Sequence, residues 1–151
     1  MKSLLKILLL SFAGLAAATF VVSCSDDDNE TIIDQTQLPA NAKTFIDLYF
    51  AGDKVAKVEQ EHNPTSYDVY FVSGAEVEFD AAGEWTDVKA AFGSSVPTGI
   101  VPDFILSYLE TNLPDAQITE ISKTISGGYE VDLNNDTDLV FDSMGNLVEV
   151  D

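Results

Sequence analysis

Tyr67–Lys89 reads YDVYFVSGAEVEFDAAGEWTDVK, and 62 positions further along the chain Tyr129–Asp151 reads YEVDLNNDTDLVFDSMGNLVEVD. Both stretches open with Tyr-acid-Val, continue with alternating apolar and acidic residues, and contain Phe-Asp followed after two further residues by glycine. Alternation with a period of two is typical of antiparallel strands that bury one face of a sheet and expose the other. The sequence therefore predicts two similar halves built around antiparallel strands.

Turn signals divide the first stretch into short strands. Ser73-Gly74 predicts a two-residue turn, and Asp80–Gly83 predicts a turn that ends on a left-handed glycine. The position of Trp85 depends on the length of that second turn. A three-residue loop places Trp85 opposite Phe79 in the core, whereas a four-residue loop turns it outward beside Glu78.

A short helix is predicted ahead of each set of strands. Pro39 and Pro102 suit a first helical turn, where the missing proline N–H leaves no hydrogen bond unmade. Apolar residues at helical spacing follow each proline: Ala42, Phe45, Ile46 and Tyr49 in the first half, and Phe104, Ile105, Tyr108, Leu109 and Leu113 in the second. A further strand is expected after each helix, at 55–61 and at 118–125.

These elements predict an α+β fold for residues 38–151. Each repeat, 38–89 and 101–151, consists of a helix followed by four antiparallel strands, and residues 90–100 link the two repeats. A four-stranded half would bury its helix poorly alone. We therefore expect one domain, in which a single eight-stranded antiparallel sheet carries both helices on one face.

The N-terminal region carries targeting signals. Residues 1–23 combine two lysines with a long apolar run, which is typical of a signal peptide. The segment Val21–Cys24 (VVSC) resembles the lipobox of bacterial lipoproteins, in which the cysteine thiol accepts diacylglycerol. An ordinary secretory signal that leaves Cys24 as a free thiol is the alternative.

Residues 24–37 are predicted to form a disordered tether, because their acidic run repels itself and extends. The acidic run after Cys24 resembles a signal for export to the outer face in some Gram-negative bacteria, and a solvated spacer is the alternative. We expect an outer-membrane lipoprotein of a Gram-negative bacterium that faces either the cell surface or the periplasm. It would contact the membrane through its lipid anchor alone.

The composition excludes several functional classes. The 151 residues include 7 Lys+Arg, all of them lysine, against 26 Asp+Glu, and the net charge is −19. Such a surface repels the backbones of DNA and RNA. Because Cys24 is the single cysteine, no disulfide can form within the chain. The chain has one histidine, His62, and no arginine, which argues against most histidine-based catalytic sites and most phosphate-binding sites.

The order of four motifs resembles a known family. Residues 38–151 contain, in order, LP…FI..YF, YDV.F..G.EVEFD..GEW, VP.GIVP..I..YL and GYEVDLNND.DLVFD..GN. This order resembles the PepSY-like, β-lactamase-inhibitor-protein-like domains of bacterial envelope lipoproteins. The resemblance implies the tandem helix-plus-sheet fold of β-lactamase inhibitory protein, which binds an enzyme through its open sheet face. One departure is that the inhibitory proteins carry disulfides, which this chain cannot form.

Acidic pairs are the main candidates for catalysis. A hydrolase that uses a pair such as Glu76 and Glu78 is one hypothesis, but alternating carboxylates are also the ordinary composition of a solvated strand face. Ser94-Ser95 lacks the strained turn of a nucleophile elbow. His62 stands beside Asn63-Pro64, where a surface turn explains it. The sequence therefore predicts neither an enzyme nor a bound cofactor, with calcium as the one alternative.

A candidate metal site lies in the second half. Asp132, Asn134, Asp136 and Asp138 place oxygen ligands at alternate positions, as at the start of a calcium-binding loop. The segment lacks the glycine and the final glutamate that complete an EF-hand loop. It also coincides with a predicted hairpin turn, which favours Asn and Asp without any metal. An acidic calcium- or cation-binding structural envelope lipoprotein is therefore the alternative function.

Exposed apolar residues on the open sheet face favour a binding function. The alternation that turns Val69 and Phe71 inward places Tyr70 and Val140 on the solvated face among carboxylates. Trp85 joins them if its turn has four residues. The sequence therefore predicts a non-enzymatic, lipid-anchored binding module of the cell envelope. Its open sheet face would recognise an envelope or secreted protein or peptide, with inhibition of a peptidase or another hydrolase as a special case.

Overall fold

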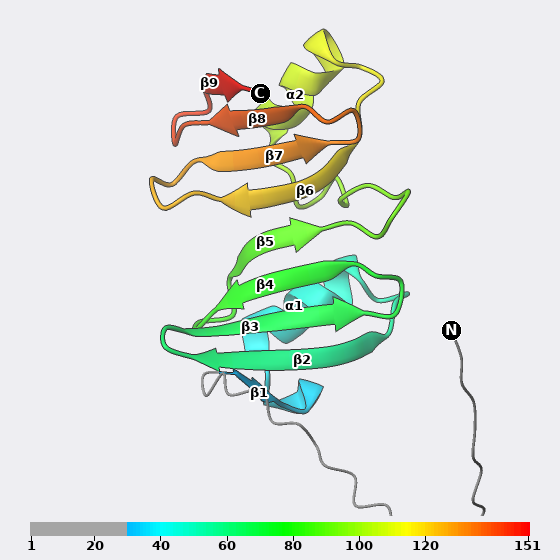
Figure 1. Cartoon of the computed structure of the whole chain (residues 1–151), viewed down its shortest axis with the longest axis vertical. Coiled ribbons are helices and arrows are strands. Elements are labelled where there is room, and N and C mark those ends of the chain that lie inside the picture. Colours follow the sequence, from blue (N-terminus) through cyan, green and yellow to red (C-terminus); the bar gives the residue numbers. More distant parts are fainter. Residues whose placement is uncertain (1–29) are drawn as a thin grey trace, which may run out of the picture.

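The computed structural model describes residues 30–151, which form two helices and one sheet (Figure 1). The strands are β1 (Glu30–Ile32), β2 (Val55–His62), β3 (Thr65–Phe71), β4 (Glu76–Asp80), β5 (Trp85–Lys89), β6 (Ile118–Lys123), β7 (Tyr129–Leu133), β8 (Asp138–Phe141) and β9 (Leu147–Val150). The helices are α1 (Ala40–Tyr49) and α2 (Asp103–Asn112), and a 3₁₀ helix, η1, spans Gln35–Gln37. Within residues 30–151, neither α-helix is long and apolar enough to cross a membrane.

All strands belong to one open sheet in chain order, β1 to β9, and every neighbouring pair is antiparallel. Helix α1 precedes β2–β5 and helix α2 precedes β6–β9. Both helices lie on the same face of the sheet, so the opposite face is open (Figure 1). The α+β class, the single antiparallel sheet and the two helices on one face are as expected from the sequence.

The sheet has nine strands, whereas the sequence predicted eight. The additional strand, β1, comes from the segment 24–37 that was expected to be a disordered tether. It pairs with the outer edge of β2, and directly after it the Ile33 backbone N–H donates to the Val58 carbonyl at 3.0 Å. Ile33 also packs against the core. A short apolar segment inside a polar run therefore gains both hydrogen bonds and burial that its composition alone does not indicate.

The segment between β1 and α1 is also structured. Asp34 caps η1 by accepting the Thr36 backbone N–H at 2.9 Å, and the Gln37 side chain accepts the Asp34 N–H at 2.9 Å. This reciprocal arrangement satisfies two donors that a short helix would otherwise leave unpaired. Of the predicted tether, residues 30–37 are thus part of the fold, and residues 24–29 lie outside the described part of the chain.

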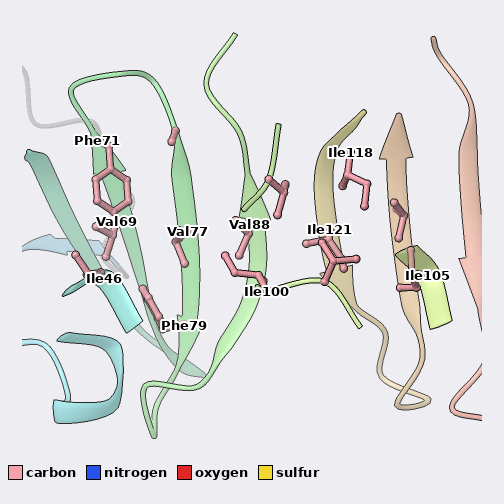
Figure 2. Close-up of a cluster of buried hydrophobic side chains, with 14 of the residues drawn as sticks. Ile46, Val69, Phe71, Val77, Phe79, Val88, Ile100, Ile105, Ile118 and Ile121 are labelled. Carbon is pink, nitrogen blue, oxygen red and sulfur yellow. The ribbon is translucent and has the colours of Figure 1, made fainter. Parts of the chain in front are cut away.

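The core is built on a row of apolar side chains that crosses eight strands. Each member lies directly opposite the next, and all but the last are buried: Val58, Val69, Val77, Val88, Ile121, Val131, Leu139 and Val150. Figure 2 shows Ile46 of α1 and Ile105 of α2 beside members of this row. The row continues across the β5–β6 pair, so one core serves both halves of the sheet.

The residues that link the halves belong to this core. Val96, Ile100 and Val101 are buried, and the Val96 N–H donates to the Ile118 carbonyl at 2.9 Å. Figure 2 shows Ile100 beside Val88 in the buried cluster. The linker therefore covers the middle of the sheet, between the areas that the two helices cover.

Candidate functional site: the open sheet face

A row of carboxylates runs across the open face. Because alternate strand residues point to opposite faces, the residues next to the apolar row face solvent. In strand order they are Glu59, Asp68, Glu78, Asp87, Ser122, Glu130, Val140 and Glu149, each directly opposite the next. We call this set the acidic row.

A second row on the open face holds the few positive charges near the acidic row. Its members, again opposite one another, are Lys57, Tyr70, Glu76, Lys89, Glu120, Asp132 and Asp138. Lys57 Nζ lies 2.8 Å from Glu59 Oε1, and Lys89 Nζ lies 3.6 Å from Glu120 Oε2. Two lysines cannot balance the carboxylates of both rows, so the open face carries a strong negative potential.

The crowding of carboxylates changes their acidity. Partial burial, followed by repulsion from Glu120 and Glu78, raises the pKa of Asp87 to about 7. Partial burial, followed by repulsion from Glu78 and Glu61, raises the pKa of Asp68 to about 6. The pKa of Glu78 is also raised, first by partial burial and then by Glu61. Like charges directly opposite across a sheet destabilise it, and a positively charged ligand would relieve that repulsion.

The closest group of carboxylates lies where β1 joins the sheet. Glu30 is directly opposite Glu61, and one ligand oxygen from each of Glu30, Glu61 and Asp68 lies within 4.8 Å of the other two. Among residues 30–151 this is the one group of three or more His, Cys, Asp or Glu side chains so arranged. Beside it, Thr31 Oγ1 and His62 Nε2 are 2.8 Å apart. Such a set of oxygen ligands suits a hard cation such as Ca²⁺.

Tyr70 and Val140 lie on the open face, as the alternation predicted. Tyr70 is opposite Glu76, and Lys57 Nζ lies 4.2 Å from the centre of its ring. Val140 is opposite Glu130 and belongs to the acidic row. Tyr70 is in β3 and Val140 is in β8, and five strand spacings of about 4.8 Å separate them by roughly 24 Å. The two residues therefore do not form one patch.

Trp85 lies on the opposite, helix-covered face. It pairs with Phe79, and a register shift between Glu78 and Phe79 accommodates it there. Its ring centroid lies 6.4 Å from that of Phe45 in α1, and Lys123 Nζ lies 4.1 Å from its ring centre. Of the two positions that the sequence left open, the structure has the one in or beside the core. Trp85 therefore cannot share a binding surface with Tyr70.

The candidate metal residues of the second half form a β-hairpin. Asp132 and Asp138 are opposite each other, and Asp136 lies in the turn with a φ of 59°. The Asn134 side-chain oxygen accepts the Gln117 backbone N–H at 3.0 Å, so this oxygen already has a partner. Partial burial, then repulsion from Asp138, raises the pKa of Asp132. Metal binding at this hairpin stays a prediction.

One predicted site residue lies outside the described part of the chain, and some residues of the open face were not predicted. Cys24, the predicted lipidation residue, lies outside the described residues. Asp68, Asp87 and the cluster of Glu30, Glu61 and Asp68 were not predicted from the sequence. The predicted two-residue turn Ser73-Gly74 was wrong: Phe71 pairs with Ala75, so the turn has three residues, Val72–Gly74, and this register places Asp68 opposite Glu78.

Comparisons with known proteins agree with this fold. Residues 65–149 match the family model described as beta-lactamase-inhibitor-like and PepSY-like. A crystal structure from Bacteroides vulgatus, provisionally described as a periplasmic protein, is 39% identical, with a TM-score of 0.78 over 83% of this chain and 98% of that one. A second protein from the same species, described as of unknown function, is 30% identical, with a TM-score of 0.76 over 81% of this chain and 98% of that one.

A further similar structure comes from Bacteroides thetaiotaomicron. It is provisionally described as a calcium-regulated periplasmic protein and is 40% identical, with a TM-score of 0.77 over 81% of this chain and 96% of that one. The comparison with curated proteins finds no match.

Proposed function

This chain belongs to the PepSY-like, beta-lactamase-inhibitor-like family, and we propose that it is a non-enzymatic binding module of the periplasm. Its acidic row would receive a positively charged segment of a partner protein. Similar proteins that are provisionally described as periplasmic support the location. The lipobox-like segment supports an outer-membrane lipid anchor at Cys24.

The observation that carries this proposal is the register of the sheet. It aligns Asp68, Glu78 and Asp87 directly across three strands, and the pKa of each of these three carboxyl groups is raised. A basic segment lying on them would exchange repulsion between like charges for attraction. Complementary potentials also speed the encounter between partners. Inhibition of a secreted or periplasmic hydrolase is a special case that rests on the family resemblance alone.

The test compares two variants of equal net charge. The bait is residues 24–151 with Cys24→Ser, used to capture partners from a native envelope extract. The open-face variant carries Asp68→Asn, Glu78→Gln and Asp87→Asn. The control variant removes three exposed carboxylates elsewhere: Asp47→Asn, Glu110→Gln and Asp115→Asn.

We expect the open-face variant to bind the captured partner at least about tenfold more weakly than the control variant, measured by titration with the purified partner. The affinity of the unaltered bait should fall as salt rises, because exposed charges are screened beyond about 8 Å at physiological ionic strength. Equal affinity of the two variants would contradict binding on the acidic row.

Calcium binding is the second candidate function, and the cluster of Glu30, Glu61 and Asp68 favours it. A 40% identical protein provisionally described as calcium-regulated supports it as well. Ca²⁺ prefers six to eight oxygen ligands at about 2.3–2.6 Å, and the cluster offers three carboxylates before water is counted. A bound ion would also neutralise the charge that opposes the pairing of β1 with β2.

Calorimetric titration with calcium chloride distinguishes the two candidate positions. If the cluster binds Ca²⁺, Glu61→Gln should weaken binding at least about tenfold, since it removes a charged ligand, while Asp136→Ala should have no effect. The reverse pattern would assign the ion to the hairpin of Asp132–Asp138. Absence of binding in the millimolar range would remove calcium from the proposal.

A further inference from the structure

The outer edge of β9 has free backbone hydrogen-bonding groups. Asp151 exchanges hydrogen bonds with Asp138 in both directions, at 3.0 and 3.1 Å. Hydrogen-bonded and non-bonded pairs alternate along antiparallel strands, so Val150, opposite Leu139, directs its N–H and C=O away from β8. Within residues 30–151, no strand pairs with this side of β9. Its N–H and C=O are therefore available to another extended chain.

Strand β5 is the counterpart of β9 in the first half, and its outer side is paired with another strand. Strands β5 and β9 have the same register against their preceding strands: Trp85 opposite Phe79 and Val88 opposite Val77 in the first case, and Leu147 opposite Phe141 and Val150 opposite Leu139 in the second. On its outer side β5 pairs with β6, where Val88 is opposite Ile121. Val88 is 0% exposed as a result, whereas Val150 is 55% exposed.

The opposite edge of the sheet is covered in a comparable way. There β1, only three residues long, pairs with β2 and ends the sheet. An extended segment of modest length is therefore sufficient to cover an edge of this sheet. Strand β9 ends the sheet on the other side, and within the described chain no further segment pairs with its side that faces away from β8.

We propose that β9 binds an extended segment of a partner protein, which adds to the sheet as a tenth strand in the position that β6 occupies beside β5. This inference rests on the proposed binding function and names how the partner is held. Backbone hydrogen bonds would supply affinity, and alternate side chains would supply specificity.

Charge determines which segment fits. In β5, Asp87 and Lys89 face Ser122 and Glu120 of β6. In the second half of the chain, Glu149 corresponds to Asp87 and Asp151 corresponds to Lys89, and both are acidic. A segment with basic residues on the open face and an apolar residue against Val150 therefore complements the edge. A second copy of β9 would instead place carboxylates beside carboxylates, which destabilises a sheet.

A peptide based on β6 tests the proposal. The probe is a synthetic peptide with the sequence of residues 117–125 that carries Glu120→Lys and Ser122→Lys. The comparison peptide carries Ser122→Glu and keeps Glu120. Binding to residues 24–151 with Cys24→Ser is measured by fluorescence anisotropy, and amide hydrogen exchange is followed at Val150 by NMR.

We expect the basic peptide to bind at least about tenfold more tightly than the acidic one and to slow exchange of the Val150 amide. Val150→Pro should weaken binding at least about tenfold, because proline removes the outward N–H. It should still fold, since proline is tolerated on an edge strand where that N–H has no partner. Val150→Thr retains the N–H and should bind normally.

Three results would overturn the inference. In the first, Val150→Pro binds the peptide with unchanged affinity while the open-face variant loses affinity. The acidic row would then be the binding surface. Another is the absence of any Val150 protection at saturating peptide. The third is a dimer of the chain alone, detected by analytical ultracentrifugation and abolished by Val150→Pro, which would assign the edge to a second copy.

Discussion

Phe79→Ala is expected to lower the free energy of unfolding by about 3–5 kcal/mol, since it removes a large buried side chain and leaves a cavity. Phe79 is 0% exposed and lies between Tyr67 and Trp85 on the neighbouring strands. The Phe45 ring of α1 meets it edge-on, with centroids 5.5 Å apart and planes at 85°. The substitution therefore weakens strand packing and helix docking together.

Urea unfolding followed by circular dichroism measures this effect. The matched control is Phe92→Ala. This substitution removes the same side chain at a fully exposed position, where Phe92 has a relative exposure of 106%. A surface substitution of this kind should change stability by no more than about 0.5 kcal/mol. Similar losses for Phe79→Ala and Phe92→Ala would show that the core is not packed as described.

The second large effect concerns pH. Burial and repulsion raise the pKa of Asp87 to about 7 and that of Asp68 to about 6 in the folded protein. The folded state therefore binds protons more tightly than the unfolded chain, in which both carboxyls titrate near 3.8. These two groups favour folding most at low pH, and their contribution is lost as pH rises through about 4 to 7. We expect the protein to be more stable at about pH 5 than at about pH 8.

Asp87→Asn isolates the largest part of this effect. At about pH 8 the variant should gain roughly 1–2 kcal/mol in unfolding free energy, a figure reduced for solvent screening because Asp87 is only half-buried. The gain should shrink at about pH 5, where the Asp87 carboxyl is mostly protonated. Asp47→Asn on the exposed side of α1 is the control and should have little effect at either pH. A destabilising effect of Asp87→Asn at about pH 8 would contradict the repulsion.

Local patterns in the sequence were sufficient to predict most helices and strands and to assign strand residues to the two faces of the sheet. The prolines at 39 and 102 preceded helices that begin at Ala40 and Asp103. The alternation on either side of the turn at Val72–Gly74 located β3 and β4 and placed Tyr70 on the open face, although the turn has three residues rather than the predicted two. These features depend on residues close together in the chain, where period and turn chemistry specify the structure.

Long-range pairing could not be predicted in the same way. No hairpin turn connects β5 to β6, so only packing in the folded chain aligns Asp87 with Ser122 and makes the acidic row continuous across both halves. β1 likewise forms because the edge of β2 offers hydrogen bonds and Ile33 reaches the core. The position of Trp85 depended on a register shift opposite Phe79. The sequence therefore specified which residues alternate between core and solvent, whereas the order and register of distant strands, which depend on burial shared by the whole sheet, were established only by the folded structure.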